Sequence, residues 1–163
     1  MYIDNTYFTG ELSIPNSQSY PNSNLDGNKV SLSQFIGEYE VELMTYALGY
    51  DLYSEFKLAF DSEGKLKQAA EQRWKDFVNG KEYEIDGKKF KWKGLRYIEG
   101  VIKKSLIADY VYCKYLENYQ VSFGGVGTQT ENAKNATKVS PIPRIVNTWN
   151  GFLSKYQGEQ GGN

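Results

Sequence analysis

GLRYIEGVIKKSLIADYVYCKYLENY, residues 94–119, is the longest stretch without a turn signal in this chain of 163 residues. Leu95, Ile98, Ile102, Leu106 and Cys113 recur at the spacing of one stripe of an amphipathic helix. From residue 106 to residue 116 the apolar side chains spread around most of the circumference, which is typical of a helix surrounded by other elements. The pattern predicts a central helix over 94–119 with the rest of the chain packed around it.

The composition argues against several classes of protein. The net charge of -1 is unlike that of a protein that binds nucleic acid through a strongly basic surface. The chain has no histidine, the side chain most used in acid–base catalysis and the commonest metal ligand. Its single cysteine, Cys113, excludes an intrachain disulfide and a cysteine-cluster zinc site. The composition therefore gives no indication of a metal site, and the first residues lack the pattern of a secretory signal.

Residues 1–30 are predicted to form an extended N-terminal arm. The first fourteen residues carry six large apolar side chains, an unusual number for a free tail, and 15–28 have the Asn, Ser, Gly and Pro composition of a loop. The arm is expected to add to a neighbouring subunit. The alternative is an ordinary frayed terminus.

The remaining periodicity predicts a mainly α domain over residues 31–156, with four to five helices around the central one. The first helix opens at Ser31 and ends or bends at Gly49, followed by a second helix over 51–60. A third helix covers 66–78. The last helix starts after Ser140, and its apolar stripe runs from residue 142 through Trp149 to residue 156.

Residues 81–92, KEYEIDGKKFKW, predict a β-hairpin with a two-residue Asp86-Gly87 turn. The turn sets the register, which places Tyr83 opposite Phe90 and Glu84 opposite Lys89. The apolar side must rest on the helices or on another chain, because an isolated hairpin is marginally stable. Residues 120–140 are predicted to be a long polar loop and 157–163 a flexible tail.

Few residues suggest chemistry. The glycine-rich stretch 124–127 lacks the lysine and the strand–turn–helix context of a phosphate-binding loop. Glu38, Glu40 and Glu42 are interpreted as one solvated helix face. Asp109 is the one carboxylate inside the apolar run. We interpret it as partly exposed or paired with a Lys or Arg, and a catalytic carboxylate is the alternative.

Several pieces occur in an order that resembles one family. They are LGYDLY at 48–53, NGKEY at 79–83 with its Asp-Gly hairpin, KGL at 93–95, the 123–126 loop, and Ser140 before the last helix. Over roughly residues 31–156 this resembles the head–tail connector proteins, or portal-adaptor ring proteins, of tailed bacteriophages, especially those of crAss-like phages. Residues 1–30 are not part of the resemblance.

The resemblance implies a small helical subunit of the virion neck, assembled in the host cytoplasm as a homo-oligomeric ring, typically of twelve copies. Such a ring lies beneath the portal protein, meets the tail or a second ring protein, and extends the channel for double-stranded DNA. DNA passing through without specific binding suits a near-neutral subunit. The resemblance implies no catalysis and no cofactor, and no contact with a membrane is expected. Alternatives are a tail-completion or head-closure protein of the same virion, a monomeric helical domain, and a small enzyme or binding domain using Asp109 and the surface carboxylates.

The residues expected at subunit or partner interfaces belong to the arm, the hairpin and the long loop. They are Tyr2, Tyr7, Phe8, Tyr83, Phe90, Trp92, Phe123, Gly124, Gly125, Val126, Lys134 and Lys138.

Overall fold

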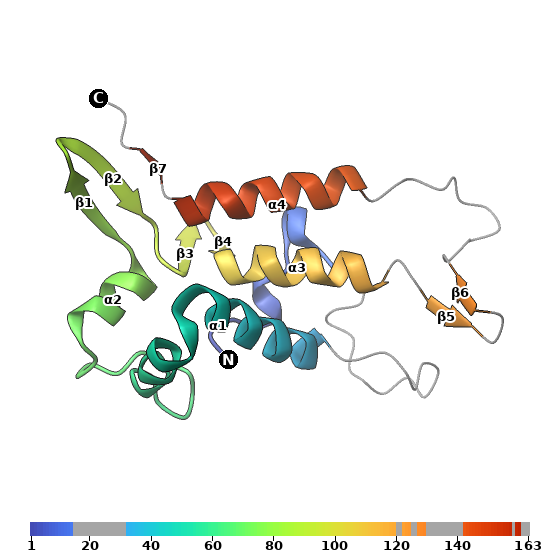
Figure 1. The fold of residues 1–163 in the computed structure, drawn as a ribbon, viewed down its shortest axis with the longest axis horizontal. Helices are drawn as coiled ribbons and strands as arrows, with labels where there is room; N and C mark the ends of the chain where they lie inside the picture. The colour runs from blue at the N-terminus through green and yellow to red at the C-terminus, as the bar shows by residue number, and fades with distance from the viewer. Residues whose placement is uncertain (15–31, 120–121, 125–126, 130–141, 158, 161–163) are drawn as a thin grey trace.

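A computed structural model describes residues 1–14, 32–119, 122–124, 127–129, 142–157 and 159–160. The fold is mainly α (Figure 1). Its elements in chain order are the short 3-10 helices η1 (Asn5–Tyr7) and η2 (Gly10–Leu12), α1 (Leu32–Leu58), α2 (Gln72–Asn79), β1 (Lys81–Ile85), β2 (Lys88–Trp92), β3 (Arg96–Glu99), β4 (Ile102–Ser105), α3 (Leu106–Tyr119), β5 (Ser122–Gly124), β6 (Gly127–Gln129), α4 (Ile142–Gln157) and β7 (Glu159–Gln160).

Helix α3 lies between α1 and α4 and is the centre of the fold (Figure 1). Ile107, Ala108 and Val111 are fully buried, and Tyr112 and Cys113 nearly so. A helix buried around its circumference is what the apolar run predicted. The predicted start was wrong, because the central helix begins at Leu106 rather than at residue 94.

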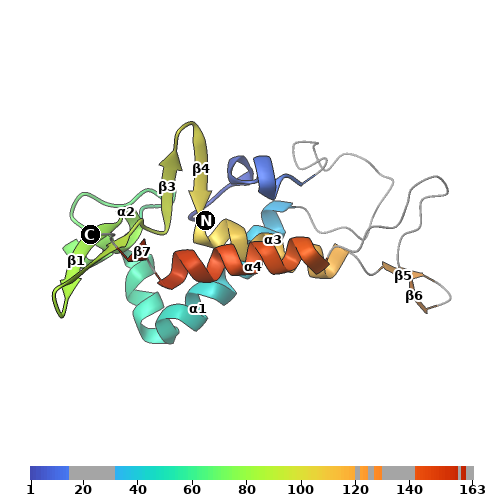
Figure 2. The same cartoon turned by 90° about the horizontal axis from the view of Figure 1, so that it is seen from above.

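The first part of that predicted helix is a second β-hairpin. Strands β3 and β4 pair antiparallel, with Ile98 opposite Lys103. Ser105 then starts the helix: its hydroxyl accepts a hydrogen bond from the Ile107 amide at 3.1 Å and donates one to the Leu95 carbonyl at 2.7 Å. A serine that satisfies a first-turn amide is a typical N-cap. The hairpin projects from the body on the side of the N-terminal residues (Figure 2).

Helix α1 bends where the sequence predicted a break, because Gly49 has the non-helical dihedrals φ 74° and ψ 169°. Beyond the bend, Phe56 is fully buried at the centre of an aromatic cluster. Its ring centroid lies 5.1 Å from Tyr2, 4.9 Å from Phe60 and 5.2 Å from Trp74. The cluster joins the chain start, α1 and α2 into one core.

The predicted helix over 66–78 is shorter than expected. Residues 66–71 are not helical, because the chain turns back after α1: Leu66 forms a β-bridge with Phe60, and the Lys67 amide donates to the Ala59 carbonyl at 2.8 Å. Helix α2 begins only at Gln72. Its Trp74 and Val78 are buried, as predicted for that face.

The β1–β2 hairpin confirms the predicted register pair by pair, including Tyr83 opposite Phe90 and Glu84 opposite Lys89. Asp86 and Gly87 both have positive φ, at 50° and 74°, as a type I′ turn requires. The sequence predicted one hairpin, but the described residues contain three, β1–β2, β3–β4 and β5–β6. Strand β7, in the predicted tail, adds to the edge of β2.

The hairpin β1–β2 enters and leaves the body through two glycines that touch each other's backbone. A Cβ on Gly80 would lie 2.6 Å from the Trp92 carbonyl oxygen, and one on Gly94 would lie 2.5 Å from the Val78 carbonyl oxygen. Both have left-handed φ values, 95° and 98°. Any side chain at either position would push apart the two segments of backbone that cross here.

The prediction of an extended arm was wrong for residues 1–14, which pack on the chain's own core. Ile3, Phe8 and Ile14 are 3%, 3% and 5% exposed. The anchor lies far away in sequence: the carboxylate of Glu40 accepts the backbone amides of Tyr2 at 2.7 Å and Ile3 at 3.2 Å. Residues 15–31 fall outside the described residues.

The apolar stripe of the last helix is only partly buried. Phe152 packs inside, whereas Val146 and Trp149 are 48% and 40% exposed. The prediction that this stripe faces the core therefore holds for one edge of α4. The other edge presents large apolar side chains at the surface.

Candidate functional site

An apolar pocket of about 400 Å³ opens between α1, α2, the foot of the β1–β2 hairpin and the end of α4. Its walls include Leu43, Ala47 and Leu48 from α1, Trp92 from β2 and Tyr156 from α4. The volume falls in the range that holds a small ligand or a few side chains.

The charged groups of this pocket satisfy each other. The ammonium of Lys81 lies 2.7 Å from a carboxylate oxygen of Asp76, and the Gln72 amide donates to the same carboxylate at 2.6 Å. The hydrogen bond from Lys81, followed by the one from Gln72, lowers the pKa of Asp76. The carboxylate therefore stays ionised and paired, which favours an apolar occupant over a charged one.

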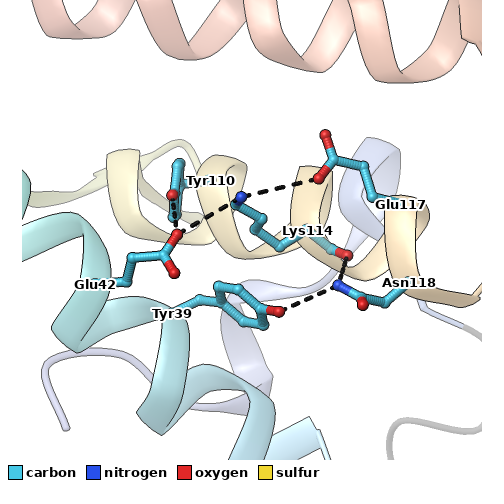
Figure 3. A network of polar contacts seen from close by, with 6 residues as sticks. All are labelled: Tyr39, Glu42, Tyr110, Lys114, Glu117 and Asn118. Carbon is cyan, nitrogen blue, oxygen red and sulfur yellow. Dashed lines mark hydrogen bonds and ion pairs between the residues drawn. The ribbon is translucent and has the colours of Figure 1, made fainter.

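A polar network joins α1 to α3 (Figure 3). The Tyr110 hydroxyl donates a hydrogen bond to Glu42, and the Lys114 ammonium lies 3.6 Å from the same carboxylate. Asn118 donates to the Tyr39 hydroxyl at 3.2 Å. Burial, followed by the bond to Glu42, raises the pKa of Tyr110. The phenol therefore stays protonated and acts as a donor that holds two helices together, not as a base.

Two carboxylates lie inside the body. Asp109 is 4% exposed and forms an ion pair with Lys155, which ties α3 to α4 and agrees with the prediction of a paired charge. Glu40 is 3% exposed, so placing it on a solvated face with Glu38 and Glu42 was wrong. Burial raises the pKa of both groups. Each holds one end of the chain on the core, and neither faces the pocket.

The predicted interface residues of the arm do not form a free surface. Tyr2 and Phe8 are buried in the chain's own core, and Tyr7 is half-buried beneath the Lys103 ammonium, 5.5 Å from its ring centroid. Tyr2 contacts Phe60 at 4.6 Å between ring centroids. The six apolar residues expected to reach a neighbour instead close this chain's own fold.

The aromatic side of the β1–β2 hairpin divides into a supported and an unsupported part. Trp92 stacks on Phe77 at 6.0 Å, and its indole N–H donates to the Phe77 carbonyl at 2.8 Å. Tyr83 stacks on Phe90 at 5.9 Å but is 40% exposed, and Ile85 at the tip is 52% exposed. The expected support by the helices therefore reaches the foot of the hairpin but not its tip.

The long loop is described only in part. Phe123 and Gly124 lie on β5, which pairs with β6. Gly125, Val126, Lys134, Lys138 and the first residue of the predicted helix start, Ser140, lie outside the described residues.

Sequence reasoning missed the most exposed apolar group among the residues that the structure describes. At the tip of the β3–β4 hairpin, Val101 is 96% exposed, Ile98 71% and Ile102 39%. The signal was present: three β-branched residues surround Gly100, between the punctuating Gly94 and the helix-capping Ser105. The spacing of Ile98 and Ile102 also fits a helix, and this led to the wrong prediction of a helix through these residues.

Comparison with known proteins leaves the family open. No family model, no curated protein and no solved structure matches this chain. Within the described residues, none of the helices combines the length and apolar character that crossing a bilayer requires. The same residues contain no cluster of three or more acidic or cysteine side chains suited to a metal ion.

Proposed function

We propose that this chain is a structural subunit of a phage virion, which assembles into a ring between the portal and the tail and extends the DNA channel. One observation carries the proposal. Large apolar side chains stand exposed on the projecting tip of β3–β4, on the β1–β2 hairpin and along α4, while the ionisable groups inside the body are paired. Exposed apolar groups of this kind mark surfaces that meet other proteins.

The order of motifs resembles that of head–tail connector proteins, and this supports the ring next to the portal as the assembly in which the exposed apolar surface is covered. The near-neutral charge of the chain suits a channel subunit through which DNA slides. The buried pairing of Asp109 with Lys155 gives the only carboxylate in the apolar run a structural role. Each point supports assembly over catalysis.

The test is assembly of the purified chain and its binding to the portal protein encoded by the same phage. Sedimentation velocity over a range of concentrations and negative-stain images should show closed rings, and the rings should co-sediment with portal. The tail protein without portal serves as the matched comparison. Binding to tail but not to portal would indicate a head-closure or tail-completion role, and a monomer at about 1 mM that binds neither would overturn the proposal.

A further inference from the structure

The tip of the β3–β4 hairpin is a rigid apolar knob. Its base is fixed by the Ser105 hydroxyl on the Leu95 carbonyl, by Arg96 donating to the Tyr2 carbonyl at 3.0 Å, and by Lys103 donating to the Thr6 hydroxyl at 2.8 Å. Turn tips ordinarily carry small or polar residues. A nearly fully exposed Val101 on a fixed hairpin loses little conformational freedom when it is buried against a partner.

The apolar pocket offers a matching cavity on the same chain. Leu43, Ala47 and Leu48 line the α1 wall, and Tyr156 lines the α4 wall. The Asp76–Lys81 pair is internally neutralised, so the pocket requires no charge from its occupant.

Knob and pocket lie on different sides of the molecule. The β3–β4 hairpin projects on the side of the N-terminal residues, and the helices α1 and α4 that form two of the pocket walls lie on the other side (Figure 2). A chain cannot fill its own pocket with this knob, but a second copy can. Two different patches that complement each other give a heterologous contact, which closes into a ring when the rotation permits.

The charges around the two patches also complement each other. The hairpin 96–105 carries Arg96, Lys103 and Lys104 against one carboxylate, Glu99. On helix α1, which forms one wall of the pocket, the exposed carboxylates are Glu38, Asp51 and Glu55, the last paired with Arg73, against Lys57. A basic hairpin approaching an acidic helix is favoured in orientation and in rate of encounter.

We propose that the β3–β4 tip of one copy, with Ile98, Val101 and Ile102, inserts into the pocket between α1, α4 and the β1–β2 foot of the next copy. The proposal rests on the proposed ring and names its contact. Each subunit supplies one knob and one pocket, so the contact repeats around the ring.

Two substitutions test the contact from its two sides. Val101→Asp places a carboxylate in an apolar pocket, and Ala47→Trp fills the pocket from its own wall. Each should weaken self-association at least about tenfold, measured by sedimentation equilibrium, because the buried charge or the lost cavity removes the fit. Leu58→Asp is the matched control, since it puts the same charge on an apolar side chain that is 74% exposed but lies outside both hairpins, α4 and the pocket lining, and this variant should associate like the unchanged chain.

Cysteine pairing identifies the occupant directly. Under mild oxidation, a mixture of Val101→Cys and Ala47→Cys chains should give a disulfide-linked dimer, whereas neither variant alone should, because the only native cysteine, Cys113, is buried. Coupling of Ala47→Cys with Ile85→Cys instead would show that the β1–β2 hairpin is the occupant and would overturn the contact.

The outcomes also separate the contact from the ring. Rings that form unchanged with Val101→Asp or Ala47→Trp overturn the contact and leave the proposed function standing. Absence of any oligomer or portal binding in the unchanged chain overturns both.

Discussion

The aromatic cluster around Phe56 and the tip of the β3–β4 hairpin are both built from large apolar side chains, yet one is closed and the other open. Phe56 is 0% exposed among Tyr2, Phe60 and Trp74, whereas Val101 is 96% exposed. Burial of apolar area stabilises the fold only where it occurs within the chain. The difference indicates that the cluster maintains the fold, whereas the tip of the hairpin contributes little to it.

The largest expected change in stability comes from the buried aromatic cluster. Phe56→Ala should lower the free energy of unfolding by about 3–5 kcal/mol, because the ring leaves a cavity at the meeting point of three elements. Urea unfolding followed by circular dichroism measures it. Ile85→Ala is the exposed counterpart and should change stability by less than about 0.5 kcal/mol. Equal losses in the two variants would remove the distinction between cluster and tips.

A substitution of Glu40 tests whether the first residues of the chain contribute to the buried core. Glu40→Ala should cost about 2–3 kcal/mol, because the backbone amides of Tyr2 and Ile3 lose their buried acceptor. Glu38→Ala, on an exposed side chain of the same helix, should be nearly neutral. Limited proteolysis should then release the N-terminal residues from the Glu40 variant first. Stability unchanged in both variants would mean that these residues do not contribute to the core.

The second buried carboxylate gives a smaller effect that depends on pH. Burial raises the pKa of Asp109 in the folded chain, so its proton is held more tightly there than in the unfolded chain. Its contribution to stability is full below the ordinary carboxyl pKa and is lost as the pH rises through the raised value. As the pH rises from the ordinary carboxyl pKa through the raised pKa of Asp109, the unchanged chain should therefore lose stability relative to Asp109→Asn. Parallel curves of unfolding free energy against pH would contradict this.

The smallest expected change in stability comes from the exposed tip of the β3–β4 hairpin. Val101→Asp should alter the unfolding free energy of the dissociated chain by no more than about 0.5 kcal/mol, since the side chain touches solvent. Thermal unfolding at concentrations below association measures it. A loss of several kcal/mol would show that the tip packs within its own chain.

The elements that the sequence predicted well are set by neighbours in sequence. The β1–β2 hairpin follows from the Asp86-Gly87 turn, and every strand pair agrees with the predicted register. The bend in α1 follows from Gly49. Local chemistry suffices for such features because the turn itself fixes the geometry.

The features that the sequence predicted wrongly depend on residues far away in the chain, or on an apolar spacing that fits both a helix and a strand. Nothing near Tyr2 indicates that Glu40 binds its amide. The pairing of Asp109 with a basic residue was predicted, but not its partner Lys155, which lies 46 residues away. Ile98 and Ile102, four residues apart, fit both a helix and a hairpin, and the tertiary context selects the hairpin. Trp149, in the middle of a regular stripe, remains 40% exposed because α3 covers only one edge of α4.

The contact between Gly80 and Gly94 means that the segment they enclose starts and finishes at nearly the same point in space. Replacing it with a longer, shorter or unrelated sequence would leave the distance between the flanking elements unaltered. The tip of this hairpin is therefore the natural position at which to graft a fluorescent or affinity label, because a label there leaves the packing of Trp92 on Phe77 intact.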